Sequence, residues 1–192
     1  MNRDEQTIWQ RHCPVPLAGD GEQVTLAHGE GGRTMRKFIQ QRIISALGLD
    51  DSHLMGDAAE LEKIDGPLAF ATDSFVVSPL FFPGGDIGSL AVYGTMNDLA
   101  VSGARPHYLS LSLILEEGLP LEIVDRVVSS IAEAASVTGI RIVTGDTKVV
   151  PRGAADGIFI NTSGVGQLVD PIPPGPGSLR EGDELIVTGP IG

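Results

Sequence analysis

The chain has 192 residues, of which 42% are hydrophobic and 20% charged, and its formal net charge is −12. An acidic surface of this kind repels nucleic acids and anionic membranes, so neither is expected as a partner. The one cysteine, Cys13, excludes an internal disulfide framework and favours a reducing compartment. No signal-peptide pattern begins at residue 1 and no run reaches about 18 apolar residues, so we expect a cytoplasmic protein without a membrane span.

The expected elements alternate between helices and strands. A lead-in rich in proline and glycine, expected to be extended or flexible, covers residues 1–25, and a glycine loop follows at 28–32. Helical periodicity or a run of small buried residues predicts helices over 33–47, 87–102 and 121–137. Strands are predicted over 68–77, 108–115, 158–166 and 184–188, with another starting at 139–143. Turns are predicted at 82–86 and 117–120, and a proline-rich loop at 170–177.

The order strand–helix–strand from residue 108 to 143 bears on the fold class. Such a unit is typical of folds in which helices pack on a sheet. The sequence therefore predicts an α/β or α+β fold with a mixed sheet and flanking helices.

Four aspartates stand beside small or hydroxyl residues: Asp57, Asp73, Asp98 and Asp146. Mg²⁺ takes oxygen ligands, usually one or two carboxylates completed by phosphates and waters, so aspartates that converge could hold Mg²⁺ on a nucleotide. Each also has an ordinary explanation. Asp57 could cap a helix, Asp73 could sit in a turn, and Asp98 could be a solvated helix residue. Asp146 is the stronger candidate, because Gly145 would let the backbone approach a ligand closely.

The glycine loop at residues 28–32 could hold a phosphate, because glycines expose backbone N–H groups and a helix is predicted directly after them. No Gly-Lys-Ser or Gly-Lys-Thr sequence occurs, so the loop is not a Walker motif. A flexible entry to the helix explains the same glycines equally well.

Lys148 lies two residues after Asp146, so in a strand the two side chains would share one face. Near a metal–phosphate site, Lys148 could neutralise a phosphate or transfer a proton. It could equally be a strand-end lysine that reaches solvent.

Seven motifs follow one another along the chain. They are HGEGGRTM at 28–35, ATDSFVV at 71–77, PLFFPGGDIG at 79–88, GTMNDLA at 94–100, ILEEGLP at 114–120, VTGDTKVV at 143–150 and FINT at 159–162. In order and spacing they resemble the HypE hydrogenase-maturation proteins, from Val24 to the end of the chain. The wider superfamily includes aminoimidazole ribonucleotide synthetase, selenophosphate synthetase and thiamine-monophosphate kinase. The resemblance implies a homodimer whose N-terminal sheets pair into a β-barrel and which binds ATP with Mg²⁺ in a cleft.

The resemblance also implies roles for individual residues. The residues implied to bind metal are Asp57, Asp73, Asp98 and Asp146. These four would also bind the nucleotide, together with Gly29, Gly31, Gly32, Asn97 and Thr144. Lys148 would lie at the chemistry.

By the same resemblance, residues 26–169 form an ATP-binding and dimerisation domain, and 170–192 form a linker and the start of a C-terminal domain. HypF would carbamoylate a C-terminal cysteine, ATP would drive dehydration of that group to a thiocyanate, and the HypC–HypD complex would receive the cyanide ligand. This chain ends at Gly192, and Cys13 is not the C-terminal cysteine. We therefore expect this chain to fold and dimerise without completing the cycle by itself.

Two alternatives stay open. The first is another ATP-dependent member of the superfamily. Selenophosphate synthetase is disfavoured because no cysteine stands beside a lysine in the lead-in, and thiamine-monophosphate kinase because residues 56–58 lack a doubled aspartate. The second is a non-catalytic module for dimerisation and docking of the other maturation proteins.

Overall fold

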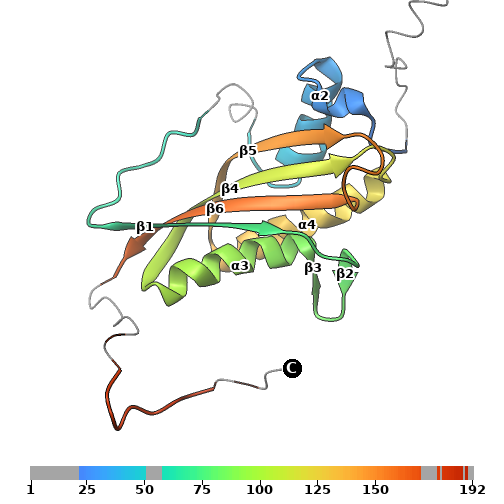
Figure 1. The fold of residues 1–192 in the computed structure, drawn as a ribbon. Helices are drawn as coiled ribbons and strands as arrows, with labels where there is room; N and C mark the ends of the chain where they lie inside the picture. The colour runs from blue at the N-terminus through green and yellow to red at the C-terminus, as the bar shows by residue number, and fades with distance from the viewer. Residues whose placement is uncertain (1–21, 51–57, 170–176, 178, 188, 190–192) are drawn as a thin grey trace, which may run out of the picture.

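The computed structural model describes residues 22–50, 58–169, 177, 179–187 and 189. Its helical elements are η1 (Leu26–Gly29), α2 (Arg33–Phe38), η2 (Ile39–Ile44), α3 (Ile87–Val101) and α4 (Leu121–Thr138). Its strands are β1 (Leu68–Phe75), β2 (Phe81–Phe82), β3 (Gly85–Asp86), β4 (Ala104–Glu116), β5 (Arg141–Val150) and β6 (Ile158–Leu168) (Figure 1). Every helix and strand expected between residues 68 and 168 is present, and the predicted mixed sheet with flanking helices is confirmed.

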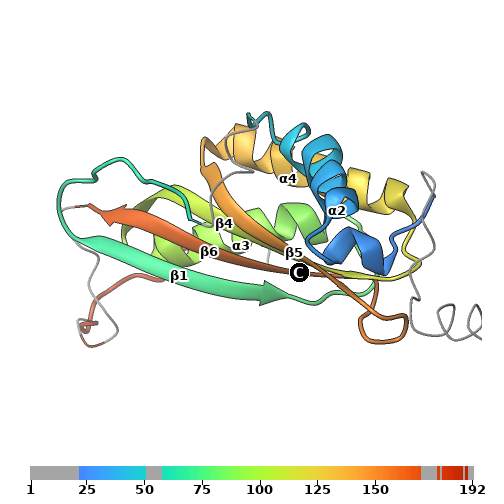
Figure 2. The ribbon, with the colours of Figure 1, turned by 90° about the horizontal axis from the view of Figure 1, so that it is seen from above.

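A four-stranded sheet in the order β1–β6–β4–β5 organises the fold. Strands β4 and β5 are parallel, as their connection through α4 requires, and β6 is antiparallel to β1 and β4. The register aligns Asp73 with Thr162, and Thr162 with Leu111. Leu111 in turn lies beside Gly145, so one row of residues crosses all four strands. Strands β1 and β5 form the two edges of this sheet, and β5 lies beside α2 (Figure 2).

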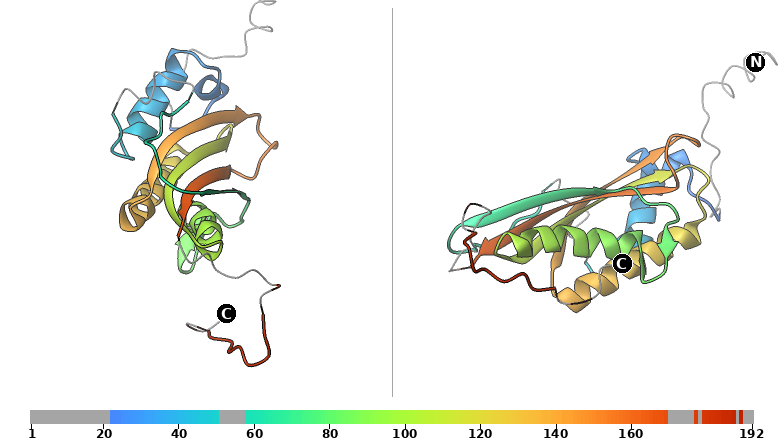
Figure 3. Two further views of the ribbon diagram at one scale, coloured as in Figure 1. Left: turned by 90° about the vertical axis from the view of Figure 1, so that its left-hand side faces the viewer. Right: turned by 60° about the horizontal axis from the view of Figure 1, so that its bottom comes forward.

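The hydrophobic core lies between one face of the sheet and helices α3 and α4 (Figure 3). Strand alternation turns every second side chain of β4 toward these helices, and four leucines are buried there. They are Leu109, Leu111, Leu113 and Leu115. The helices approach closely, because a Cβ on Gly88 of α3 would lie 2.6 Å from the Val127 carbonyl oxygen of α4. No helix in the described part of the chain is long and apolar enough to cross a membrane.

The opposite face of the sheet carries no helix of the described residues (Figure 3, left). Its side chains include Phe70, which is 70% exposed, and Leu68, which is 53% exposed. Ile114 of β4 is 37% exposed on the same face. Leu68 and Phe70 are neighbours on this face, whereas Ile114 lies farther along the sheet, opposite Phe159. Exposed apolar neighbours such as Leu68 and Phe70 are typical of a surface that another molecule covers.

The helix expected over 33–47 is only partly α-helical, and this prediction was wrong in its second half. Helix α2 ends at Phe38, and η2 continues as a π-helix in which the Ser45 N–H donates to the Gln40 carbonyl oxygen. In the wider turn both Ile43 and Ile44, which are adjacent in sequence, are buried. A spacing argument that assumes 3.6 residues per turn does not anticipate this.

The turn expected at 82–86 is a tight hairpin between β2 and β3, with Gly84 in the left-handed region at φ 92. Asp86 then caps α3, because its Oδ1 accepts hydrogen bonds from the N–H groups of Gly88 (2.7 Å) and Ser89 (3.1 Å). The Asp86 N–H donates in return to the Ser89 hydroxyl oxygen (3.1 Å). This reciprocal cap fixes where α3 begins.

Residues 22–25, the last of the expected lead-in, belong to the packed part of the chain. The Leu121 N–H donates to the Glu22 carbonyl oxygen (2.9 Å). Val24, which is fully buried, donates to the Leu119 carbonyl oxygen and accepts from the Gly118 N–H, both at 2.8 Å. The lead-in is therefore bound to the turn between β4 and α4 just before the glycine loop. Residues 1–21, including Cys13, lie outside the described part.

The strand expected over 184–188 is absent from the residues that the structure describes there, 184–187. Leu185 and Ile186 are 96% and 80% exposed, and no described strand pairs with them. A strand needs a partner edge, and local β propensity alone does not provide one. The loop expected at 170–177 lies outside the described residues except for Gly177.

Thr162→Val is expected to destabilise the fold by about 1–3 kcal/mol, the usual cost of a buried hydroxyl without a partner. The hydroxyl oxygens of Thr95 and Thr162 are 2.6 Å apart and both side chains are fully buried. The substitution keeps the shape but removes the partner of Thr95. Urea unfolding followed by circular dichroism measures the loss.

The double variant with Thr95→Val is the control, because replacing both hydroxyls leaves neither one unpaired. It should cost less than the single variant. A double variant whose loss equals the sum of two single losses would contradict this explanation.

Candidate functional site

The predicted site residues fall into two groups at opposite edges of the sheet. The first group comprises the glycine loop at 28–32 and residues 144–148 of β5. The second comprises Asp73 of β1 and the neighbours Asn97 and Asp98 of α3. Asp57 lies outside the described residues.

The glycine loop packs directly on β5. A Cβ on Gly29 would lie 2.6 Å from the Val149 backbone nitrogen, so glycine allows this close approach. His28 beside it accepts a hydrogen bond at Nδ1 from the Thr25 N–H (2.9 Å), and its ring packs on Phe38 with centroids 5.0 Å apart. Burial lowers the pKa of His28, which keeps the ring neutral and able to accept. Gly29 therefore joins the loop to the strand.

The other two glycines are open. Gly31, at φ +78, and Gly32 have no atom within 4 Å of the position of a Cβ. The Gly31 N–H donates to the Met35 sulfur (3.1 Å), which is a weak acceptor. An anionic oxygen is a stronger acceptor and would compete for this N–H group. This part of the loop can therefore receive an anion.

Strand β5 presents polar side chains by alternation. Asp146 and Lys148 are exposed, and Thr147 between them is buried. The two side chains therefore share one face, as expected for a strand. Asp146 pairs in register with Ser112 of β4, on the face that α3 and α4 leave uncovered, and Thr144 is exposed on the same face. The strand brings these three predicted residues together.

Gly145 has a different role from the one that the sequence suggested. A Cβ there would lie 2.2 Å from the Leu111 carbonyl oxygen of β4, closer than side chains tolerate. The register of β4 and β5 also shifts by one residue between Leu109 and Ser110. The close approach of a neighbouring strand is by itself enough to explain the glycine.

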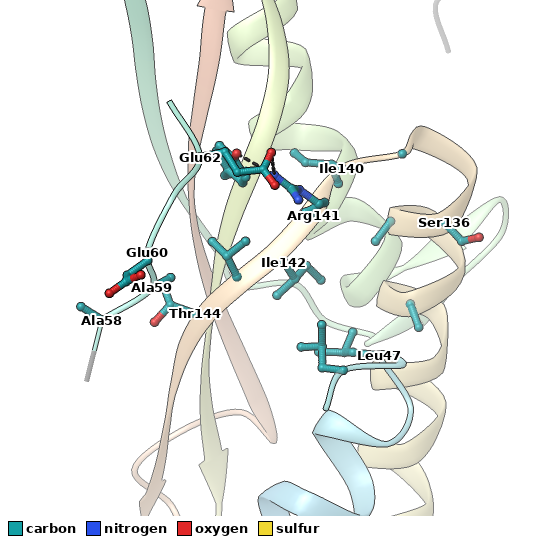
Figure 4. A pocket seen from close by; sticks show the side chains of 16 residues that line it. Leu47, Ala58, Ala59, Glu60, Glu62, Ser136, Ile140, Arg141, Ile142 and Thr144 are labelled. Atoms are coloured by element: carbon teal, nitrogen blue, oxygen red, sulfur yellow. Dashed lines mark hydrogen bonds and ion pairs between the residues drawn. The ribbon is translucent and has the colours of Figure 1, made fainter. Parts of the chain in front are cut away.

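Two adjoining cavities follow β5. The smaller, about 380 Å³, lies between η2 and the strand, and its walls include Gly31 and Asp146. The larger, about 910 Å³, lies at Arg141, between β5, residues 58–62 and the end of α4 (Figure 4). Both cavities are lined by Leu47, Leu49, Ile142, Val143 and Thr144. The two cavities together are called the β5 groove below, and each volume lies in the range of small-molecule sites, roughly 300–1,000 Å³.

Arg141 forms a polar corner of the groove that the sequence analysis missed. Its Nη2 donates to the Tyr108 hydroxyl (2.6 Å) and to Oε2 of Glu62 (3.1 Å), as Figure 4 shows for Glu62. The hydrogen bond to Glu62 raises the pKa of Arg141. Both partners of this ion pair are more than half exposed, so it adds little stability. Arg141, Glu62 and Tyr108 are far apart in the sequence, so no local motif predicts that they are in contact.

The second group lies on facing elements. Asp73 is inside β1, not in a turn, and Asn161 of β6 donates to its backbone oxygen (2.9 Å). Gly94 of α3 lies against it, because a Cβ there would be 3.8 Å from Oδ2 of Asp73. Asp98 follows Gly94 by one turn on the same helix face, and helical side chains lean toward the N-terminus. Asp98 and its neighbour Asn97 are both exposed at this part of the helix.

The two groups do not meet within one chain. The row from Asp73 to Gly145 spans three strand spacings, or about 14 Å at roughly 4.8 Å each. Asp73 also lies on the helix side of the sheet, whereas Asp146 lies on the uncovered side. The described residues contain no group of three or more His, Cys, Asp or Glu side chains that could hold a metal. Asp73 and Asp146 therefore do not lie at one site within a single chain.

The chain is similar to known proteins over most of its length. Residues 55–168 match the family described as AIR synthase related protein, N-terminal domain. The chain is 52% identical over 178 residues to the carbamoyl dehydratase HypE of Rhodobacter capsulatus, covering 89% of this chain and 51% of that protein. The chain thus spans about half the length of the curated relatives it matches.

Two solved structures of HypE share the fold. A crystal structure of HypE in complex with ATP matches with a TM-score of 0.74 and 52% identity, covering 78% of this chain and 45% of that one. A HypE–HypF complex matches with a TM-score of 0.53 and 50% identity, covering 68% and 42%. The chain therefore belongs to the family of AIR synthase related proteins, and it contains the N-terminal domain of that family.

Proposed function

We propose that this chain is the ATP-binding part of a carbamoyl dehydratase of the HypE type, which acts in hydrogenase maturation. The observation that carries the proposal is the β5 groove, which the open glycine Gly31 lines together with Thr144 and Asp146. The fold around it resembles that of HypE in complex with ATP. A chain with a net charge of −12 needs local features of this kind to hold an anionic nucleotide.

In this proposal the open N–H groups of the glycine loop bind phosphate oxygens. Asp73 and Asp98, with Asp57, hold Mg²⁺, and Asn97 adds an amide oxygen beside them. Bound Mg²⁺ neutralises the charge that develops on the transferred phosphoryl group. Lys148, on the same face as Asp146, neutralises a phosphate oxygen or accepts a proton.

The proposed reaction converts an S-carbamoyl group on a cysteine into a thiocyanate. The γ-phosphoryl group of ATP is transferred to the carbamoyl oxygen with release of ADP, and phosphate then leaves with that oxygen while the nitrogen loses its two protons. Phosphate is a much better leaving group than an amide oxygen. The protein therefore needs only to position the reacting groups and to stabilise the developing charge. We place the carbamoylated cysteine in the half of the relatives that this chain does not cover. HypF, which forms a complex with a relative, is the proposed carbamoyl donor, and the HypC–HypD complex the acceptor of the cyano group.

We also propose a homodimer that joins the two groups of site residues. The exposed Phe70 and Leu68 lie on the uncovered face of the sheet, and β1 and β5 are its two edges. A dimer that sets the β1 edge of one chain beside the β5 edge of the other closes the sheets into a barrel. It also brings Asp73 and Asp98 of one chain to Asp146 of its partner.

Isothermal titration calorimetry tests the nucleotide site. The chain is expected to bind ATP only with Mg²⁺, and Asp146→Asn is expected to weaken binding about 10- to 100-fold, the usual value of a charged contact. Asp156→Asn is the matched control, because Asp156 is exposed in the loop after β5, outside both cavities. A folded, dimeric chain that binds no ATP would contradict the proposal and favour the dimerisation and docking module.

A further inference from the structure

One turn of the chain, residues 116–119, contacts two segments that lie next to the β5 groove: the end of β5 and the segment that leads into the glycine loop. Glu116, the last residue of β4, accepts hydrogen bonds at its two carboxylate oxygens from the N–H groups of Gly153 and Gly157 in the loop between β5 and β6. The Glu117 N–H adds a bond to the carbonyl oxygen of Val150, the last residue of β5 (2.9 Å). The end of β5 is thereby tied to the end of β4.

The same turn also holds the segment before the glycine loop. Gly118 and Leu119 pair with Val24 through two backbone hydrogen bonds of 2.8 Å. Val24 stands two residues before η1, which leads into the glycine loop. Gly29 of that loop then packs against Val149 of β5. The loop and the strand thus meet each other and are both anchored to residues 116–119.

A carboxylate suits this position for a physical reason. The loop at 151–157 has no regular structure, so its N–H groups need acceptors from elsewhere. Glu116 satisfies two of them with one side chain, and the guanidinium of Arg152 packs over Gly118 beside it. The hydrogen bond from Gly153 is the main cause that lowers the pKa of Glu116, which keeps it an acceptor.

We propose that Glu116 is a positioning residue for the nucleotide. By fixing the loop after β5 it keeps the segment 148–149 against the glycine loop, and so sets the width of the groove in which phosphate would bind. The inference rests on the proposed ATP-binding function. The structural coupling between the glycine loop and the end of β5 does not depend on that function.

Glu116→Gln tests this role, because the amide turns one acceptor into a donor that faces an N–H group. Hydrogen–deuterium exchange is expected to rise at 151–157 and also at 26–32, which Glu116 does not touch. ATP affinity with Mg²⁺ is expected to fall about tenfold, as for other misplaced binding groups. Glu117→Gln, which changes the same charge at the next residue, should match the wild type in both measurements. Glu116→Asp keeps the charge, and its effects should be intermediate.

Faster exchange confined to 151–157, with unchanged ATP affinity, would show only a local tie and overturn the positioning role. If the wild type binds no ATP, the proposed function fails. Hydrogen–deuterium exchange at 26–32 in Glu116→Gln then still decides whether Glu116 couples the glycine loop to the end of β5. Should Glu116→Gln unfold, the same comparison is made with Glu116→Asp.

Discussion

Mixing Asp73→Asn and Asp146→Asn chains is expected to restore the tight ATP binding that each variant loses alone. Asp73 and Asp146 lie on the two edge strands of one sheet and on opposite faces of it. If the dimer joins Asp73 of one chain to Asp146 of the other, a mixed dimer holds one intact site and one doubly altered site. With random exchange of two-fold symmetric partners, about one quarter of all sites recover.

The measurement is the ATP stoichiometry by calorimetry with Mg²⁺, after the two chains are unfolded and refolded together. Two different affinity tags isolate the mixed dimers, and sedimentation verifies that each variant is dimeric. A mixture of Asp146→Asn with Lys148→Ala is the matched control. Both changes lie on β5, so every site in that mixture stays altered and binding should not return. Mixed dimers of the first pair that bind ATP no more tightly than either variant alone would show that each site is completed within one chain.

The sequence predicted the central sheet well because its elements carry their own patterns. The leucines at alternating positions of β4 and the apolar stripe of α4 each identify an element without knowledge of its neighbours. The π-helical turn at Ile39–Ile44 was missed because an α-helical period was assumed. The strand at 184–188 was predicted from β propensity, but a strand also depends on a partner, which local sequence does not reveal.

The site was less predictable than the fold. The exposed strand positions of Asp146 and Lys148 follow from alternation, and the open loop at Gly31 and Gly32 follows from glycine content. The separation of Asp73 from Asp146 depends on the strand order, which motifs do not encode. Arg141 and Glu116 were missed because their partners lie 33 to 79 residues away in the first case and 37 to 41 in the second. The doublet at residues 116–117, in a turn that must satisfy backbone groups, was the only sequence signal for Glu116.

Gly145→Ala is expected to lower the free energy of unfolding by at least about 3 kcal/mol, the upper end of the usual cost of overpacking. The added methyl carbon would lie 2.2 Å from the Leu111 carbonyl oxygen, which is part of the backbone and not a flexible side chain. Relief requires β4 and β5 to separate, and separation breaks the parallel ladder that aligns Leu111 with Gly145. The change therefore acts on the ladder that supports Asp146 and Lys148.

Urea unfolding followed by circular dichroism measures this loss, and the slope of the transition shows whether it stays two-state. Gly32→Ala, in the glycine loop, is the control. Its Cβ would meet no atom within 4 Å, and Gly32 has a φ of −86 that alanine adopts. It should cost about 1 kcal/mol or less, the usual price of a poorer N-cap residue. A Gly145→Ala chain within that same limit would mean that β4 and β5 can move apart freely, and the close strand contact would then not explain the glycine before Asp146.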